Sequence, residues 1–244
     1  MAARSKIYPS AEAALADLED GSRLMFGGFG LSGNAEGCIA AVAKSGKHKL
    51  TIISNNCGNQ RQGLAILLQQ RQVQKFIGSF VGGNPDLEEL MLKGEIEVEL
   101  SPQGTFAERI RAGGAGIGGF YTPTAVGTLI AEGKDERTFT VPGPDGVPVA
   151  RRMILETGLT ADFACIRAKT ADTFGNLRFY RTSKNFSPLM AMAARTTIVE
   201  AEEIVDQGAI DPDDVHLPGL FVTRIFQGSA FKNVIEQRTV RKRA

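Results

Sequence analysis

Short apolar segments alternate with segments of helical composition along most of this chain. Residues 50–54 are rich in β-branched side chains, and residues 95–100 place Ile96, Val98 and Leu100 on one face, so both are typical of strands. Such an alternation predicts an α/β fold with a mostly parallel sheet and helices on both faces. The expected strands are residues 23–26, 50–54, 75–81, 95–100, 162–168, 176–181, 196–201 and 220–226, and the expected helices are 11–19, 35–44, 63–70, 86–93, 106–112 and 188–194.

Capping residues mark several helix ends. Ser10, Asn34 and Thr105 are each expected to cap the helix that follows, because their side-chain oxygens can accept from its first free N–H groups. Gly46 and Gly94 are expected to end two helices, since glycine adopts the left-handed conformation that closes a helix.

The chain is expected to form a single domain over residues 1–244, because no linker or internal repeat divides it. Residues 134–150 interrupt the pattern with three prolines and the turn pair Asp145-Gly146, which indicates a hairpin inserted at the surface. The basic tail, residues 238–244, is expected to be a solvated terminus and not a binding patch.

Composition narrows the classes of function. The 28 basic residues balance 27 acidic ones, which disfavours a nucleic acid held by bulk charge. The three cysteines form no CxxC pair and only two histidines occur, so neither a disulfide framework nor a metal site is expected. Residues 1–20 are typical of neither a signal peptide nor a transit peptide, and no apolar run of about 18 residues occurs, so we expect a cytoplasmic location with no membrane association.

A glycine-rich loop lies between the first strand and the second helix. Residues 28–33 (GFGLSG) match the spacing GxGxxG, and small residues there would let backbone N–H groups approach a ligand at a helix N-terminus. A nicotinamide dinucleotide would also need an acidic residue at the end of the next strand, where the chain has Ser54-Asn55-Asn56. The residues leave three interpretations open: an anion- or acyl-binding loop, a dinucleotide site, and a tight turn without a ligand.

Several segments together resemble the A-subunit of the family I CoA-transferases. Residues 20–33 (DGSRLMFGGFGLSG) resemble the signature of that family. The resemblance extends over roughly residues 10–240, and it implies the open α/β sandwich of those enzymes. The other similar segments are 50–58 (LTIISNNCG), 98–104 (VELSPQG), 107–116 (AERIRAGGAG), 120–124 (FYTPT), 127–133 (GTLIAEG) and 185–194 (NFSPLMAMAA).

The chain departs from the family pattern in two places. The family's Gly-x-Pro is Gly33-Asn34-Ala35 here, and we expect a small loss of loop rigidity, since Asn34 is a good cap and Ala35 a good helix former. The family's nucleophilic glutamate, in a Ser-Glu-Asn-Gly motif of the B-subunit, is absent from the sequence. The resemblance therefore implies a separate B-subunit, in an AB or A₂B₂ assembly. Glu36 adjoins the glycine loop, but an acid in a first helical turn is expected from the helix dipole alone.

The resemblance also implies roles for individual residues. Gln103 would donate a hydrogen bond to the oxyanion that forms at the reacting carbonyl, and Asn55 and Asn56 would bind the substrate carboxylate. Ordinary turn positions are the alternative for all three residues. Phe29 is expected to be a buried hydrophobic residue, and packing against the acyl or pantetheine group is the alternative. The loop that the family assigns to CoA corresponds to Gly27, Gly28, Phe29, Gly30, Leu31, Ser32 and Gly33.

The implied reaction moves CoA from succinyl-CoA to a 3-oxo acid, with acetoacetate as the first candidate. Enzymes for 3-oxoadipate and for acetate share much of the pattern. The implied ping-pong mechanism passes through covalent adducts of the B-subunit glutamate, with CoA as a substrate and no tightly bound cofactor or metal. Two other classes stay open, a Rossmann oxidoreductase and a non-catalytic ligand-sensing domain. For the latter, the residues before Ser22 are too few for a DNA-binding helix-turn-helix.

Overall fold

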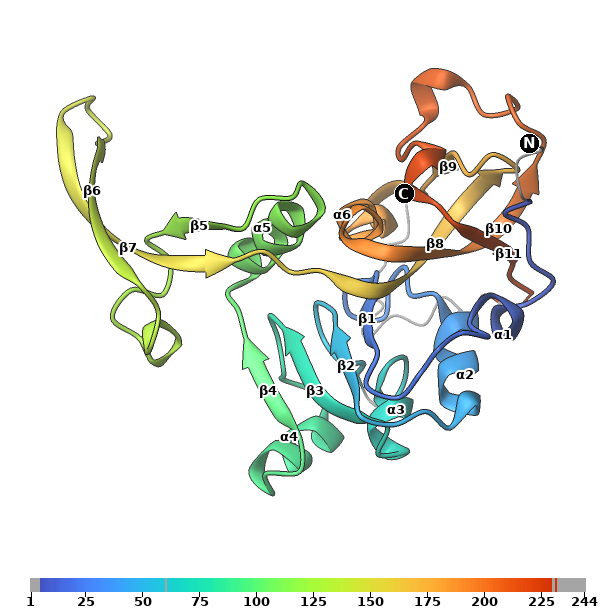
Figure 1. Ribbon diagram of the computed structural model, residues 1–244, viewed down its shortest axis with the longest axis horizontal. Coiled ribbons are helices and arrows are strands. Elements are labelled where there is room, and N and C mark those ends of the chain that lie inside the picture. Colours follow the sequence, from blue (N-terminus) through green and yellow to red (C-terminus); the bar gives the residue numbers. More distant parts are fainter. Residues whose placement is uncertain (1–4, 60, 230, 232–244) are drawn as a thin grey trace, which may run out of the picture.

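The computed structural model describes residues 5–59, 61–229 and 231 (Figure 1). The main sheet consists of β1 (Arg23–Phe26), β2 (Leu50–Ile53), β3 (Val73–Gly78), β4 (Glu97–Leu100), β8 (Ala161–Asp172), β9 (Leu177–Arg178), β10 (Ala194–Val205) and β11 (Arg224–Gln227). Its strands follow the order β11-β10-β8-β1-β2-β3-β4 with every neighbour parallel, while β9 pairs antiparallel with β8. The expected parallel sheet is confirmed.

Helices cover both faces of this sheet (Figure 1). Because strand side chains alternate between faces, Phe26 and Ile52 pack with the helices on one face, and Met25 and Ile53 pack with those on the other. The first face carries α1 (Ala11–Ala14), α2 (Glu36–Ser45), α3 (Ala65–Gln69) and α4 (Pro85–Leu92), and the second carries α5 (Gln103–Gly114) and α6 (Ser187–Ala193). Among the described residues, no helix is long and apolar enough to span a bilayer.

A second sheet projects from the body as an arm, defined here as residues 119–157 (Figure 1). It is antiparallel, in the order β5-β7-β6, with β5 at Gly119–Thr122, β6 at Glu136–Pro142 and β7 at Pro148–Thr157. The expected hairpin at residues 134–150 is therefore longer than the prediction and has a third strand. The arm also holds the 3₁₀ turn η1 (Leu129–Ala131).

Two of the three expected helix caps are wrong. Ser10 caps α1, since its side chain accepts from the N–H of Ala13, but Ala35 occupies the cap position of α2 and Pro102 that of α5. The side chain of Asn34 instead lies against Gly28. Pro102 has the φ of −52° that its ring imposes, so α5 begins earlier than expected and Thr105 lies buried inside it.

The last third of the chain contains less strand than expected. The predicted strand 176–181 is limited to β9, and η2 (Arg181–Lys184) follows it. The predicted strand 220–226 begins only at β11, because Pro218 precedes the 3₁₀ turn η4 (Gly219–Phe221); another turn, η3, spans Pro212–Asp214. The basic tail, residues 238–244, lies outside the described residues.

Candidate functional site

The carboxyl ends of β1 to β4 meet at one edge of the parallel sheet, the position where open α/β sheets bind ligands. The loops that leave this edge carry the glycine loop (residues 27–33), Asn55 and Asn56 after β2, and Gln103 after β4. Neighbouring strands lie about 5 Å apart, so the ends of β2 and β4 are separated by roughly 10 Å. The fold thus gathers the residues singled out from the sequence at what we call the sheet-edge site.

Asn185, which precedes α6, holds the glycine loop from outside. Its Oδ1 accepts from the N–H of Gly28 at 2.9 Å, and its Nδ2 donates to the carbonyl of Ser32 at 3.3 Å. Within the loop, Phe29 and Ser32 exchange two backbone hydrogen bonds of 3.0 Å. Side-chain and backbone contacts therefore fix this loop, although Ala35 stands where the family has proline.

Close packing explains why the loop needs glycine. A Cβ atom at Gly28 would lie 1.9 Å from Oδ1 of Asn34, and one at Gly27 would lie 2.4 Å from Oγ of Ser187. Gly28 also has a φ of +133°, which side chains rarely allow. The N–H groups of Gly27, Gly28, Phe29 and Ser32 all donate within the chain. These four N–H groups position the loop and are not open to a ligand.

Asn55 and Asn56 are buried and connect the loops after β2 and β3. The side-chain amide of Asn55 donates to Oγ of Ser79 at 2.8 Å, and the backbone carbonyl of Asn55 accepts from the N–H groups of Ser79 and Phe80. Asn56 donates from Nδ2 to the carbonyl of Gly58 at 3.2 Å. Each amide has two N–H groups, so one on each residue is unused within the described part of the chain.

Gln103 is the first residue of α5, and its exposed side chain makes no hydrogen bond to the described residues. The first turn of a helix concentrates free N–H groups and the positive end of its dipole. Ser101 is buried nearby, and its Oγ has no hydrogen-bond partner there either. This end of the site therefore offers uncharged donors that the fold does not use.

Two aromatic side chains are exposed on the loops of the sheet edge. Phe29 is 50% exposed and Phe80 58% exposed, so the expectation that Phe29 is buried is wrong. Exposed aromatic residues on loops of one sheet edge are typical of a surface that meets a ligand or another protein. The sequence analysis missed Ser79, Phe80, Ser101 and Asn185; the first three directly follow a parallel strand, a signal that could have identified them.

A buried carboxylate caps α2 in place of Asn34. Oε2 of Glu200, on β10, accepts from the N–H of Gly37 at 2.8 Å, and the residue is 2% exposed. Burial raises the pKa of the Glu200 carboxyl, although hydrogen bonds from Gly37 and Cys38 and the charge of Arg167 act in the opposite direction. Burial also raises the pKa of Glu36, on the first turn of α2. The helix that follows the glycine loop is therefore capped by one acidic group, Glu200, and begins with another, Glu36, and both ionise less readily than usual.

This capping arrangement predicts a pH-dependent difference in stability. Because the folded-state pKa of Glu200 is raised, its stabilising contribution is fully present below its ordinary pKa of 4.5 and is lost as the pH rises through the folded value. Glutamine does not ionise, so we expect Glu200→Gln to gain stability relative to the unaltered chain as the pH rises from 4.5. Urea unfolding at a series of pH values measures this difference. The exposed Glu132→Gln is the control, and a Glu200→Gln difference that is flat with pH would contradict the assignment.

A cavity of about 580 Å³ lies beside the glycine loop. Arg167 and Lys169 both donate to Glu202 inside it, the latter at 2.8 Å, so these charges are paired. Its lining residues are Leu31, Ser32, Gly33, Arg167, Ala168, Lys169, Tyr180, Arg181, Thr182, Ser183 and Glu202.

Comparison with known proteins gives consistent matches over nearly the whole chain. The sequence model of the family described as Coenzyme A transferase matches residues 8–228. The A-subunit of succinyl-CoA:3-ketoacid coenzyme A transferase from Helicobacter pylori J99 is 48% identical over 237 residues, covering 97% of this chain and 98% of that protein. The protein of the same name from Xanthomonas campestris pv. campestris B100 is 51% identical over 241 residues, covering 98% and 96%.

The fold matches that of a solved acyl-CoA transferase from E. coli O157:H7 in a thioester complex with CoA. The TM-score is 0.77 at 21% identity, and the match covers 92% of this chain but 47% of the other. This chain therefore spans about half the length of that transferase chain.

Proposed function

The chain belongs to the coenzyme A transferase family, and we propose that it is the A-subunit of a succinyl-CoA:3-ketoacid CoA-transferase. The observation that carries this proposal is the 48% and 51% identity to two proteins of that name, over almost their whole length. The sheet-edge site supports it, because its unused amide donors suit a reaction in which an oxyanion forms at a thioester carbonyl.

A separate B-subunit completes the proposal. The chain has no Ser-Glu-Asn-Gly motif, so the attacking glutamate would come from the B-subunit, in an AB or A₂B₂ assembly. The solved transferase supports this arrangement, since more than half of its chain lies beyond the part that matches here. We further propose that the assembly is cytoplasmic, where its three free, buried cysteines would stay reduced.

In the proposed reaction, the B-subunit carboxylate attacks the thioester carbonyl of succinyl-CoA and displaces the CoA thiolate, which leaves an acyl-glutamyl anhydride. The thiolate then attacks the glutamyl carbonyl and releases succinate, leaving a glutamyl-CoA thioester. The carboxylate of the acceptor acid then attacks the glutamyl-CoA carbonyl and displaces the CoA thiolate, which gives a mixed anhydride of the acceptor and the glutamate. The thiolate attacks the acceptor carbonyl of this anhydride, which releases the acceptor as its CoA thioester and restores the B-subunit carboxylate. This covalent route divides one difficult displacement into easier ones.

Each attack creates an oxyanion that needs donors already in place. We assign this role to the side-chain amide of Gln103, which makes no hydrogen bond to the described residues. The remaining side-chain N–H groups of Asn55 and Asn56 would bind the substrate carboxylate. We assign residues 27–33 to CoA; the cationic side chain of Arg181, in the cavity beside this loop, suits an anionic substrate. Succinyl-CoA and CoA are substrates here, and acetoacetate is the first candidate acceptor, ahead of 3-oxoadipate and acetate.

The test is CoA transfer by the purified complex of this chain with its B-subunit. We expect acetoacetyl-CoA to form from succinyl-CoA and acetoacetate, as followed by the enolate absorbance of the product. Each of the two polypeptides, when assayed alone, is the control and is expected to be inactive. A correctly paired complex that transfers CoA to no small acid, or full activity of this chain alone, would contradict the proposal.

A further inference from the structure

The segment that leads into α6 lies against both ends of the glycine loop. A Cβ atom at Gly27 would lie 2.4 Å from Oγ of Ser187, and one at Gly33 would lie 2.7 Å from the carbonyl oxygen of Ser183. Asn185, between these two serines, bonds to the backbone of the loop itself. The glycines at the ends of the loop therefore allow this segment to approach, and Asn185 fixes the contact.

The side-chain amide of Asn185 makes every hydrogen bond that it can make. Its Oδ1 accepts from the N–H of Gly28 and, at 2.7 Å, from the N–H of Phe186. Its Nδ2 donates to the carbonyl of Ser32 and, at 2.9 Å, to the carbonyl of Ser183. An asparagine amide offers one acceptor oxygen and two donor N–H groups, whereas an ionised aspartate only accepts. The contacts therefore require an amide at this position.

The backbone of Asn185 adopts a conformation that favours glycine. Its φ is +30° and its ψ is −120°. Residues other than glycine are strained in such sparsely populated regions, and the strain persists where the surrounding structure enforces it, often at functional sites. Glycine would relieve the strain but could not bond to the loop. The residue type at this position is therefore explained by its side-chain contacts and not by its backbone.

Asn185 also sets the spacing of the cavity of about 580 Å³ beside the glycine loop. Ser32 belongs to one lining segment of this cavity, residues 31–33, and Ser183 belongs to another, residues 180–183. Because Nδ2 of Asn185 donates to the carbonyls of both serines, one side chain connects the two segments. Loss of these bonds would free the two segments to move relative to each other.

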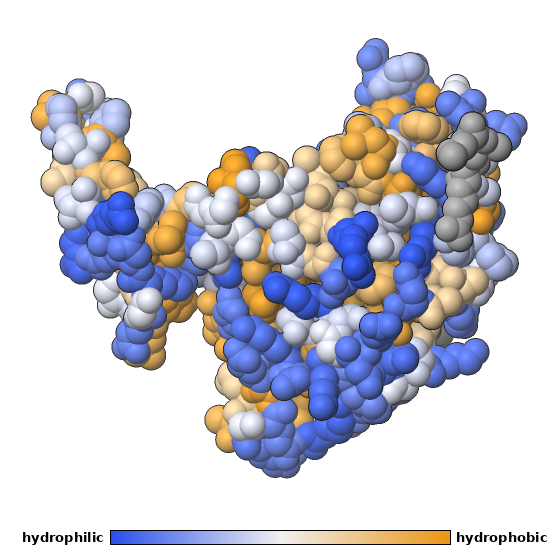
Figure 2. All heavy atoms as spheres, viewed as in Figure 1, coloured by the Kyte–Doolittle hydropathy of each residue, from blue (hydrophilic) through white to orange (hydrophobic). Residues whose placement is uncertain are grey.

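Phe186, the next residue, connects this arrangement to α5. Phe186 is 7% exposed, and its ring packs edge-to-face with that of Phe106, with centroids 5.5 Å apart. Phe106 lies three residues after Gln103 on α5. Figure 1 shows α5 and α6 side by side, and Figure 2 shows mostly apolar residues at the surface over α6. Two consecutive residues therefore contact the glycine loop and the helix that carries Gln103.

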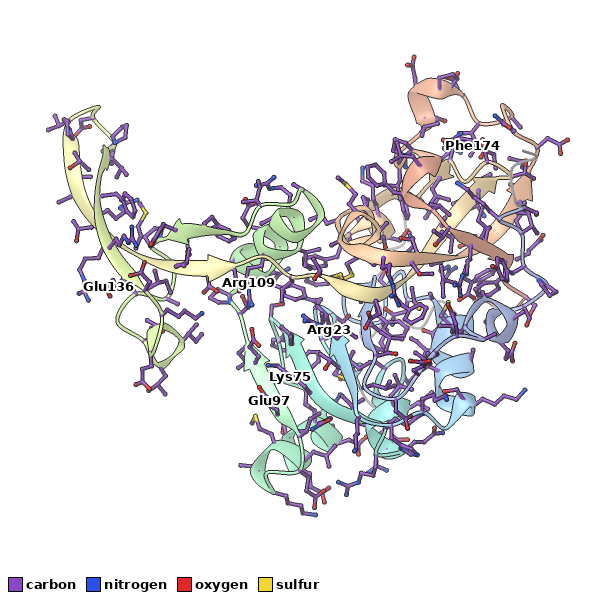
Figure 3. The ribbon with its side chains drawn as sticks, viewed as in Figure 1. Arg23, Lys75, Glu97, Arg109, Glu136 and Phe174 are labelled. Carbon is purple, nitrogen blue, oxygen red and sulfur yellow. The ribbon has the colours of Figure 1, made fainter. Side chains whose placement is uncertain are left out.

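The helix α5 is itself fixed to both sheets. Arg109 donates to Glu99 of β4 at 2.8 Å and to the carbonyl of Thr157, the last residue of β7, at 2.9 Å. Arg109 is buried, and Figure 3 shows it where α5 meets the arm. The glycine loop is therefore positioned against a helix that the rest of the fold holds in place.

We propose that Asn185 is a positioning residue for the CoA part of the substrate, because it holds the glycine loop and residues 180–183 at the spacing that CoA requires. The inference rests on the proposed function, which assigns residues 27–33 to CoA. A loop that is already in place loses less freedom on binding, so binding is tighter without any new contact. The effect of Asn185 should therefore follow the CoA group and not the acid.

The test replaces Asn185 by glycine in the complex with the B-subunit. Glycine accepts a φ of +30° without strain, so the variant should fold although all four side-chain hydrogen bonds are lost. In a ping-pong reaction, the kcat/KM of each substrate reports on its own half-reaction. We expect kcat/KM to fall about tenfold for succinyl-CoA and to stay unchanged for acetoacetate. In the reverse direction, it should fall equally for acetoacetyl-CoA and stay unchanged for succinate.

Two further variants separate positioning from other effects. Asn185→Asp keeps the acceptor oxygen but places a second oxygen against two carbonyls, so kcat/KM for succinyl-CoA should fall at least as much as in Asn185→Gly. Lys49→Gly is the matched control, because Lys49 also has a positive φ, +57°, but directly precedes β2, at the edge opposite to the sheet-edge site. It is expected to leave kcat/KM unchanged for all four substrates.

Unchanged kcat/KM for both CoA esters in Asn185→Gly would overturn the proposal. An equal fall for the acids and the CoA esters would overturn it too, because a merely structural role reduces the amount of folded enzyme for every substrate alike. If the unaltered complex transfers no CoA, the proposed function is contradicted, and calorimetric titration of both complexes with CoA tests the positioning role by itself. Asn185→Gly is expected to bind CoA about tenfold more weakly, and equal affinities, or no binding by the unaltered complex, would overturn the proposal.

Discussion

Replacing Gln103 by alanine is expected to slow CoA transfer by the complex with the B-subunit about 100-fold, because loss of one oxyanion donor typically costs 10²–10³-fold in rate. The side chain is exposed at the first position of α5 and makes no hydrogen bond to the described residues, so its removal should not change the free energy of unfolding. The thermal unfolding temperature should therefore stay unchanged while kcat falls. Steady-state kinetics with succinyl-CoA and acetoacetate measure the effect.

Two further variants separate the donor role of Gln103 from other effects. Gln103→Glu keeps the shape but puts an anion where the oxyanion forms, so it is expected to be at least as slow as Gln103→Ala. Gln70→Ala removes another exposed glutamine, at the end of α3, and is expected to leave the rate unchanged. If Gln103→Ala transferred CoA at the normal rate, Gln103 would be an ordinary first-turn residue.

Replacing Gly28 by alanine is expected to damage both stability and transfer. The new Cβ would lie 1.9 Å from Oδ1 of Asn34, at a φ of +133° that alanine disfavours. Strain and overpacking together predict a loss of about 2–4 kcal/mol in the free energy of unfolding. The loop would move off its hydrogen bond to Asn185, and a displacement of about 1 Å near the chemistry can lower the rate roughly 100-fold.

Gly94→Ala is the matched control for Gly28→Ala. Gly94 also has a positive φ, +68°, but its Cβ would meet nothing within 4 Å, and it lies at the end of α4, away from the sheet-edge site. We expect a smaller loss of stability and normal transfer, so the difference between the two variants measures the collision with Asn34. Urea unfolding and kcat/KM supply the two measurements. Equal effects of both variants would contradict a collision between the new Cβ at position 28 and Asn34.

Local sequence determined the order of elements and the edge where the site lies. The β-branched run at residues 50–53 and the apolar residues of β3 and β4 favour extended backbone whatever surrounds them, and the helical segments between them impose parallel pairing. Because the carboxyl ends of parallel strands share one edge, Asn55 and Gln103 were expected at the same edge once their strands were identified, whereas the strand order that separates them by β3 came from the tertiary structure.

Residue roles inside helix starts and loops were decided only by the tertiary structure. Asn34 has the right chemistry for a cap, yet Glu200 on a distant strand reaches the same helix, and Asn34 packs against Gly28 instead. Asn185 ties down a glycine loop far away in sequence. The reason is physical: propensity and periodicity act over a few neighbouring residues, whereas a hydrogen bond or a close packing contact depends on which distant elements folding brings together.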